Sequence, residues 1–230
     1  MKAPQINVVA GDWARRAPDL RAQFLDHAHA LLAAGFARLD RSALSEEEEP
    51  AITGHLCAAI RSFLREPDGP AWCEHFSCHE ETPLSDSGRT GKRRDRADLM
   101  IELTLPPRPE LFVEAKPLRT GESHALSEYV GADGMGCFLD GRYASAYNFG
   151  AMLAYVCAGT VEEWVAVLER RLLRDRQGLG LAVEGDVWAL AEGLPAEGAT
   201  RRSRHARQGL DPIDLFHSFC LCHDDESSNP

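Results

Sequence analysis

Two acidic residues and a lysine stand inside apolar, strand-like segments of this sequence. Asp98 lies within Ala97–Glu102, and Glu114 and Lys116 lie within Leu111–Lys116. Side chains alternate between the two faces of a strand, so Glu114 and Lys116 share one face. Burying a carboxylate and an ammonium costs desolvation energy unless something uses them. Two carboxylates beside a lysine suit Mg²⁺-dependent phosphodiester cleavage, because the carboxylates hold the metal while the cation orients water or stabilises transition-state charge.

A proline-rich segment, Pro106–Pro109, separates these two strands. Proline cannot continue a hydrogen-bonded ladder, so the segment predicts a turn and the strands form an antiparallel hairpin. Residues opposite one another in such a hairpin share a face. Asp98 joins Glu114 and Lys116 if the loop has an odd length or contains a bulge, whereas a four-residue loop separates them. We expect the three side chains to converge.

At these residues the chain resembles the PD-(D/E)XK nuclease superfamily, the fold of many restriction and repair endonucleases. The matching pieces are Asp98 and the Glu114-x-Lys116 motif on the next strand. The acidic helix that starts near Glu49 resembles one that often adds a glutamate to such sites, whereas Ala97 replaces the family's proline. The resemblance covers roughly residues 45–160. It implies an α/β fold in which helices flank a mixed central sheet with a restriction endonuclease-like core.

The resemblance also implies a site and an activity. Four charged residues form the implied catalytic set: Asp98, Glu114, Lys116 and Glu49. Asp98, Glu114, the Ala115 carbonyl and Glu49, or the glutamate before it, would hold Mg²⁺ or Mn²⁺. Lys116 would orient the attacking water and stabilise the transition state. The expected activity is that of a metal-dependent endonuclease acting on DNA in preference to RNA, in restriction or phage defence.

The net charge of the 230-residue chain is −11, which opposes non-specific binding to nucleic acid. Two basic stretches can still provide local binding. The first precedes Asp98, and its candidate nucleic-acid-binding residues are Lys92, Arg93, Arg94 and Arg96. For the second stretch, 201–207, we favour a solvated loop.

Seven cysteines, mostly in apolar segments, predict reduced thiols and a cytoplasmic location. The sequence lacks an apolar run of about 18 residues, so we expect no membrane span. Cys73–His79 holds four potential zinc ligands, although their spacing is not that of a standard finger. The alternatives to an active nuclease are therefore a zinc-stapled interaction domain and a nuclease-fold module that no longer cuts. A homodimer or a partner protein subunit is compatible with these functions.

Apolar spacing predicts the remaining elements. Helices are expected over 12–38, about 45–64, 125–130, 143–156 and 160–173. Late strands are expected within 181–191 and 212–222, a short extended piece at 137–139, and a loop over 66–91. Pro50 at the first helical position would make Glu49 the N-cap of its helix.

These elements suggest three parts of the chain. Residues 1–44 form an N-terminal helical segment, residues 45–223 a PD-(D/E)XK nuclease-like domain, and residues 224–230 a polar tail.

Overall fold

The computed structural model describes residues 18–84, 95–119, 122–182, 188–191, 194 and 200–223. The strands in these ranges are β1 (Phe76–Pro83), β2 (Arg96–Leu103), β3 (Glu110–Leu118), β4 (Phe149–Val156), β5 (Ala189–Leu190), β6 (Arg201–Arg207) and β7 (Leu210–Leu221). The helices are α2 (Pro18–Phe36), α3 (Arg41–Leu44), α4 (Glu49–Phe63), α5 (Glu122–Val130), α6 (Gly136–Leu139) and α7 (Val161–Arg174), with a 3₁₀ helix, η1, at Ala71–His75.

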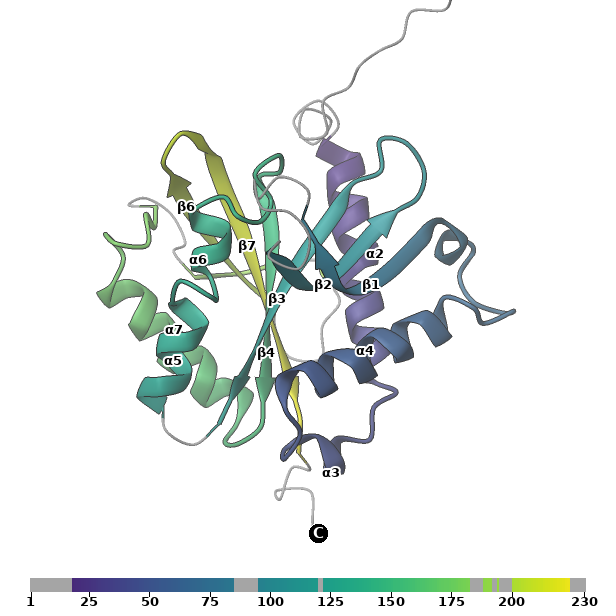
Figure 1. Ribbon diagram of the computed structural model, residues 1–230, viewed down its shortest axis with the longest axis horizontal. Coiled ribbons are helices and arrows are strands. Elements are labelled where there is room, and N and C mark those ends of the chain that lie inside the picture. The colour runs from purple at the N-terminus through teal and green to yellow at the C-terminus, as the bar shows by residue number, and fades with distance from the viewer. Residues whose placement is uncertain are drawn as a thin grey trace, which may run out of the picture.

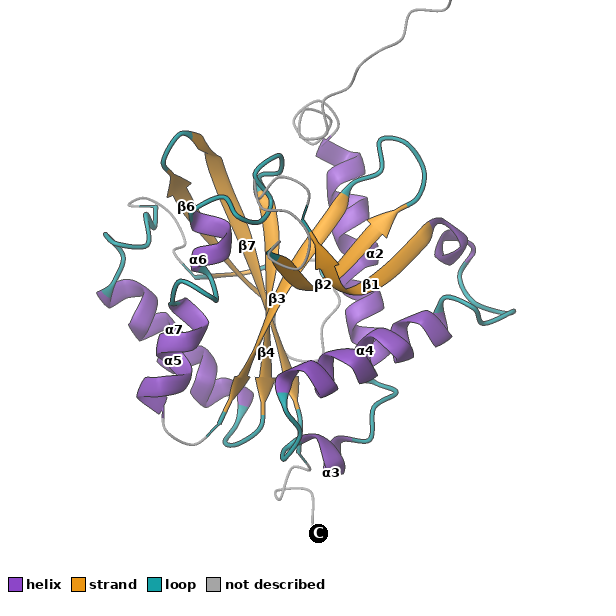
Figure 2. Ribbon diagram, viewed as in Figure 1, coloured by secondary structure: helices purple, strands orange, loops and turns teal. Residues whose placement is uncertain are grey.

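The described strands form one sheet in the order β1-β2-β3-β4-β7-β6-β5. The neighbours β3, β4 and β7 are parallel, and the other pairs are antiparallel. Helices α2 and α4 lie on one side of the sheet, and α5, α6 and α7 lie on the other (Figure 1). The expected mixed sheet flanked by helices is therefore confirmed (Figure 2). In the described ranges, no helix has the length and apolarity needed to cross a membrane.

Four of the expected helices are present where the structure describes them, and α5 contains the short helix expected over 125–130. Helix α2 accounts for the described part of 12–38, and α4 and α7 account for the helices expected over about 45–64 and 160–173. Thr160 caps α7 through a reciprocal capping box with Glu163, which explains its sharp start. Helix α4 corrects one detail, because its N-cap is Glu48 rather than Glu49, and Pro50 lies in its first turn.

The core joins α2 and α4 to the sheet. Phe24 of α2 lies 6.0 Å from both Phe76 and Phe149, measured between ring centroids. Thr53 of α4 hydrogen-bonds to the hydroxyl of the fully buried Tyr155 on β4, at 2.9 Å. The N-terminal helical segment and the sheet thus share one apolar core.

Two expectations about the middle of the chain are wrong. The segment 143–156, expected to be a helix, contains the strand β4, whose eight residues are all buried. A parallel strand covered on both faces is apolar at every position, so its periodicity does not distinguish it from a buried helix. The expected extended piece at 137–139 belongs to α6, one short helical turn.

Two further strands lie where loops were expected. The segment 66–91 contains β1, an edge strand whose Pro83 needs no ladder donor on the open side. The basic stretch 201–207 is β6, in which exposed and buried residues alternate. Among the described residues of 181–191 the regular strand is β5, while 212–222 is confirmed as β7.

Strand β6 is fixed by a fully buried chain of polar side chains. His205 Nδ1 lies 2.8 Å from the Leu179 carbonyl, which only accepts, so Nδ1 carries the proton. His205 Nε2 therefore accepts from the Ser203 hydroxyl at 2.7 Å. Ser203 accepts from His217 Nε2–H at 2.7 Å, and His217 Nδ1 accepts from the Tyr129 hydroxyl at 3.0 Å. The Leu179 carbonyl therefore determines which atom donates in each of these four hydrogen bonds.

Candidate active site

The hairpin of β2 and β3 has the register that brings the acidic residues and the lysine together. Leu99 pairs with Val113, and the N–H of Leu103 bonds to the carbonyl of Pro109 at 3.0 Å. The loop between the paired residues is therefore 104–108, which has an odd length. This register puts the three side chains on one face, so the geometric expectation is confirmed.

The strands separate where these residues lie. Main-chain pairing between β2 and β3 ends at Leu99 and Val113. Beyond that point β2 pairs with β1, and β3 pairs with β4. We call the gap between Asp98 on β2 and Glu114 on β3 the strand fork. Asp98 bridges it, because its Oδ2 accepts a 2.7 Å hydrogen bond from the backbone N–H of Ala115.

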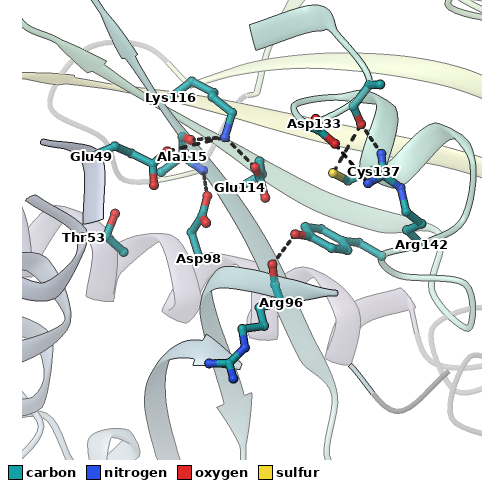
Figure 3. Close-up of polar contacts among 12 residues, drawn as sticks. Glu49, Thr53, Arg96, Asp98, Glu114, Ala115, Lys116, Asp133, Cys137 and Arg142 are labelled. Carbon is teal, nitrogen blue, oxygen red and sulfur yellow. Dashed lines mark hydrogen bonds and ion pairs between the residues drawn. The ribbon is translucent and has the colours of Figure 1, made fainter. Parts of the chain in front are cut away.

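The ammonium of Lys116 lies at the centre of the site (Figure 3). Its Nζ is 2.6 Å from Oε1 of Glu114 and 2.9 Å from the carbonyl oxygen of Ala115. Oε2 of Glu49 is 3.5 Å from the same nitrogen. One cation thus contacts two carboxylates that come from β3 and from the start of α4, with Asp98 beside them.

The acidic groups of this cluster are held in an unfavourable environment for negative charge. Burial, and then the charge of Asp98, raises the pKa of Glu114 to about 8 and that of Glu49 to about 7. Burial also raises the pKa of Asp98. Oε2 of Glu114 is buried and has no hydrogen-bond partner among the described residues. Binding of a proton or a metal cation neutralises such a cluster and therefore stabilises it.

The same carboxylates favour the charged form of Lys116. Burial alone would lower its pKa, but the charge and the hydrogen bond of Glu114 raise it above the usual range. The charges of Asp98 and Glu49 act in the same direction. Lys116 therefore remains an ammonium at neutral pH and is not suited to act as a general base.

Helix α4 contributes the third carboxylate of the site. Of the two candidates at its start, Glu49 contacts Lys116, whereas Glu48 is the exposed N-cap residue. Glu49 is the first residue of the helix, where the positive end of the helix dipole favours an acidic side chain.

The donor atoms of the cluster fit a hard divalent cation. Within the described ranges, no group of three or more His, Cys, Asp or Glu side chains is already arranged to hold a metal ion. Mg²⁺ does not need three side-chain ligands, because it keeps several waters and is bound through one or two carboxylates. Asp98 and Glu114 supply these, and Glu49 and the Ala115 carbonyl lie beside them. A cation would compete with Lys116 for Oε1 of Glu114 and for that carbonyl.

A pocket of about 590 Å³ opens beside the site between α4, β1 and β2. Four carboxylates line it, from Glu49, Glu80, Glu81 and Asp98. Arg96 is the cation among the described lining residues, and it is paired with Glu81 at 3.1 Å. The pocket is acidic, so a polyanion would enter it only with cations that neutralise its walls.

The candidate nucleic-acid-binding residues are only partly described. Lys92, Arg93 and Arg94 lie outside the described residues, whereas Arg96 is exposed at the start of β2. In the second basic stretch, Arg202 and Arg204 are exposed, while His205 and Arg207 are buried. The expected solvated loop there is wrong, because alternate residues of β6 face the core.

The four potential zinc ligands in Cys73–His79 are not gathered into a site. Cys78 and His79 are adjacent in β1 and therefore lie on opposite faces of the sheet. Cys78 Sγ lies 3.5 Å from Cys57 Sγ of α4, whereas His79 hydrogen-bonds to Ser77. Near the C-terminus, His217 is committed to the buried polar chain described above.

Two side chains that fix the site were not anticipated from the sequence. Arg119, directly after β3, donates hydrogen bonds to the carbonyls of Ser45 and Glu47, just before α4. The Tyr143 hydroxyl donates to the carbonyl of Arg96, next to the strand fork. Both contacts join segments distant in sequence, so no local pattern indicates them.

Comparisons with known proteins found no family model, curated protein or solved structure that matches this chain.

Proposed function

We propose that this chain is a metal-dependent nuclease with a restriction endonuclease-like core, which hydrolyses phosphodiester bonds in DNA. The observation that carries the proposal is the cluster of three carboxylates around one ammonium at the strand fork, in which Glu49 and Glu114 contact Lys116 and Asp98 lies beside them. Glu49, Asp98 and Glu114 come from three different elements, and Lys116 lies among them. Such a buried cluster of like charges costs folding free energy, which supports a role in binding a cation.

Each residue has a chemical task in this proposal. Asp98 and Glu114 would hold Mg²⁺ or Mn²⁺, with the Ala115 carbonyl and Glu49 as further oxygen ligands. A metal held there would supply positive charge at the phosphate and would lower the pKa of a water. Lys116, which stays protonated, stabilises negative charge that develops on the phosphoryl oxygens and orients the attacking water.

The proposed substrate follows from charge and from the family resemblance. Phosphates approach the acidic pocket only when its carboxylates are neutralised, and cationic side chains must hold the rest of the backbone. Lys92, Arg93, Arg94 and Arg96 are the proposed backbone contacts. DNA, in preference to RNA, and a role in restriction or phage defence are the expectations that the resemblance supplies.

A second candidate function is a nuclease-fold interaction module that does not cut. One observation favours it: Lys116 already bonds to Oε1 of Glu114 and to the Ala115 carbonyl, two atoms that a metal would use. A cluster neutralised from within can serve as a structural ion pair, provided that its remaining carboxylates are protonated or paired.

Cleavage assays distinguish the two functions. Single- and double-stranded DNA and RNA are incubated with the protein in Mg²⁺, Mn²⁺ or EDTA. We expect metal-dependent cleavage of DNA that is abolished in Glu114→Gln. Glu102→Gln is the matched control, because Glu102 is a half-buried glutamate on β2 that does not contact Lys116. Folded wild-type protein that binds no Mn²⁺ and cuts none of the four substrates would make the interaction module the better conclusion.

A further inference from the structure

Arg119 connects the strand that carries Lys116 to the segment that carries Glu49. It lies three residues after Lys116, and its two terminal nitrogens donate to two different carbonyls. These carbonyls belong to Ser45 and Glu47, in the link between α3 and α4. The contacts span 74 and 72 positions of sequence. The end of β3 is thereby fixed to the start of α4.

The start of α4 needs such a restraint because it carries several negative charges and lies close to the other carboxylates of the site. Glu49 follows three other glutamates, at 46–48, and it faces Asp98 across the site. The helix dipole favours acidic residues at this helix end but does not direct them towards other carboxylates. Lys116 attracts Glu49, yet a single ion pair on flexible side chains holds a backbone only weakly.

Arginine is suited to this task in a way that lysine is not. Its planar guanidinium presents donors in a fixed arrangement, so it bonds two carbonyls at once and restrains their relative position. We propose that Arg119 is a positioning residue that holds the start of α4 so that Glu49 reaches Lys116 and the metal site. The metal-binding part of this statement rests on the proposed function.

Zero-length cross-linking tests the positioning without metal or substrate. A carbodiimide activates a carboxyl group, and a lysine amine in contact with it, after losing a proton, attacks to form an amide while the reagent leaves as a urea. The products are identified by mass spectrometry. The yield of the Glu49–Lys116 link is divided by that of the Glu114–Lys116 link, which involves residues of one strand. We expect Arg119→Gln to lower this ratio several-fold. Arg119→Lys, which keeps the charge and one donor group, should give an intermediate ratio and serves if Arg119→Gln does not fold.

Arg61→Gln is the matched control. Arg61 also donates from its guanidinium to a backbone carbonyl, that of Cys78, but it does so from the far end of α4. We expect the cross-link ratio of this variant to equal that of the wild type. A ratio unchanged in both Arg119 variants, or lowered equally in Arg61→Gln, would overturn the proposal.

A double-mutant cycle on Mn²⁺ affinity then tests whether Arg119 acts through Glu49. Calorimetry is performed without nucleic acid. Removal of a residue that orients a ligand typically weakens metal binding by on the order of tenfold or more. We expect Arg119→Gln and Glu49→Gln to weaken Mn²⁺ binding similarly, and the double variant to be no weaker than the weaker single variant. Effects that multiply would show that Arg119 acts independently of Glu49 and would overturn the proposal.

The two experiments separate this inference from the proposed function. If the wild type binds no Mn²⁺, the proposed function fails, while the cross-link ratio still decides whether Arg119 positions Glu49. If Mn²⁺ binds and DNA is cut but the cross-link ratio is unaffected by Arg119→Gln, the function stands and the positioning role is wrong.

Discussion

The backbone N–H of Ala115 donates a 2.7 Å hydrogen bond to Oδ2 of Asp98, at the point where β2 and β3 stop pairing. The carboxylate thus takes the place of a main-chain acceptor and closes the strand fork. The same carboxylate lies beside Glu114 at the proposed metal site. Asp98 therefore combines a structural task with a proposed chemical one, and suitable substitutions separate the two.

Asp98→Asn should retain the fold but no longer hold the metal. The asparagine carbonyl can still accept from Ala115, whereas its neutral amide is a poor ligand for Mg²⁺. Asp98→Ala should abolish both tasks and reduce the free energy of unfolding by about 1–3 kcal/mol, because it leaves the Ala115 N–H unpaired. Urea unfolding and Mn²⁺ calorimetry measure the two effects. Equal stability of the two variants would show that the hydrogen bond contributes little.

Removal of Lys116 should separate metal binding from turnover. Because its ammonium bonds to Glu114 and to the Ala115 carbonyl, Lys116→Ala frees two ligand atoms and removes a repelling charge. We expect Mn²⁺ to bind at least as tightly as in the wild type, while the cleavage rate falls by about 10²–10³-fold because charge stabilisation is removed. Calorimetry and single-turnover cleavage of DNA measure the two quantities. A large decrease in Mn²⁺ affinity would contradict the assigned role.

The site was more predictable from the sequence than the sheet around it. Alternation along a strand is a local property, so the shared face of Glu114 and Lys116 follows from their spacing alone. An acidic run before an apolar helical face likewise indicated Glu49. By contrast, β4 is covered on both faces, and its uniform apolarity carries no period that identifies a strand.

Two further features of the structure differ from the sequence-based expectations, or were missed by them, because they depend on contacts between distant segments. Arg201–Arg207 is basic and resembles a loop, yet it is a strand because Ser203 and His205 bury their side chains against His217. Arg119 fixes a segment more than seventy positions earlier in the chain. Side-chain hydrogen bonds between distant segments leave no local pattern, so the sequence did not indicate either contact.

The stability of the metal-free protein should fall as the pH rises from 6.5 to 9. The folded-state pKa values of Glu49 and Glu114 are raised to about 7 and about 8, from a usual value of 4.5. The folded state therefore binds more protons than the unfolded state in this range, and stability decreases as the pH passes through the folded pKa values. The buried histidines have lowered pKa values, so they raise stability as the pH increases towards about 7 and oppose the glutamate effect only at the start of this window.

Thermal unfolding in EDTA at pH 6.5 and pH 9 measures this effect. We expect a lower midpoint at pH 9, a smaller difference in Glu114→Gln, and recovery at pH 9 when Mg²⁺ is added, since metal binding replaces the proton. A wild-type midpoint that is independent of pH in this window would show that the carboxylates are not held in the environment described.

The basic stretch before β2 should control substrate binding rather than turnover. Replacing Lys92, Arg93 and Arg94 by glutamine removes three positive charges. If each side chain binds one phosphate, the slope of log K against log salt should decrease in magnitude by about 0.9 for each of these charges removed. Fluorescence anisotropy with labelled DNA in Ca²⁺ measures this slope. Replacement of Arg202 and Arg204, the exposed arginines of β6, is the control, and an equal decrease in slope for each charge removed there would assign the interface to a different surface.

The buried polar chain predicts a stability effect that is independent of the active site. Ser203 accepts from His217 and donates to His205, so Ser203→Ala leaves a buried N–H and a buried ring nitrogen unpaired. Each unpaired group costs about 1–3 kcal/mol, so urea unfolding should show a decrease in stability of about 2 kcal/mol or more. Ser218→Ala is the matched control, because Ser218 is a buried serine of β7 with one long hydrogen bond, 3.3 Å to Thr200. Mn²⁺ affinity should be unchanged in both variants, and equal stability of the two would show that the hydrogen bonds of Ser203 to His205 and His217 contribute little.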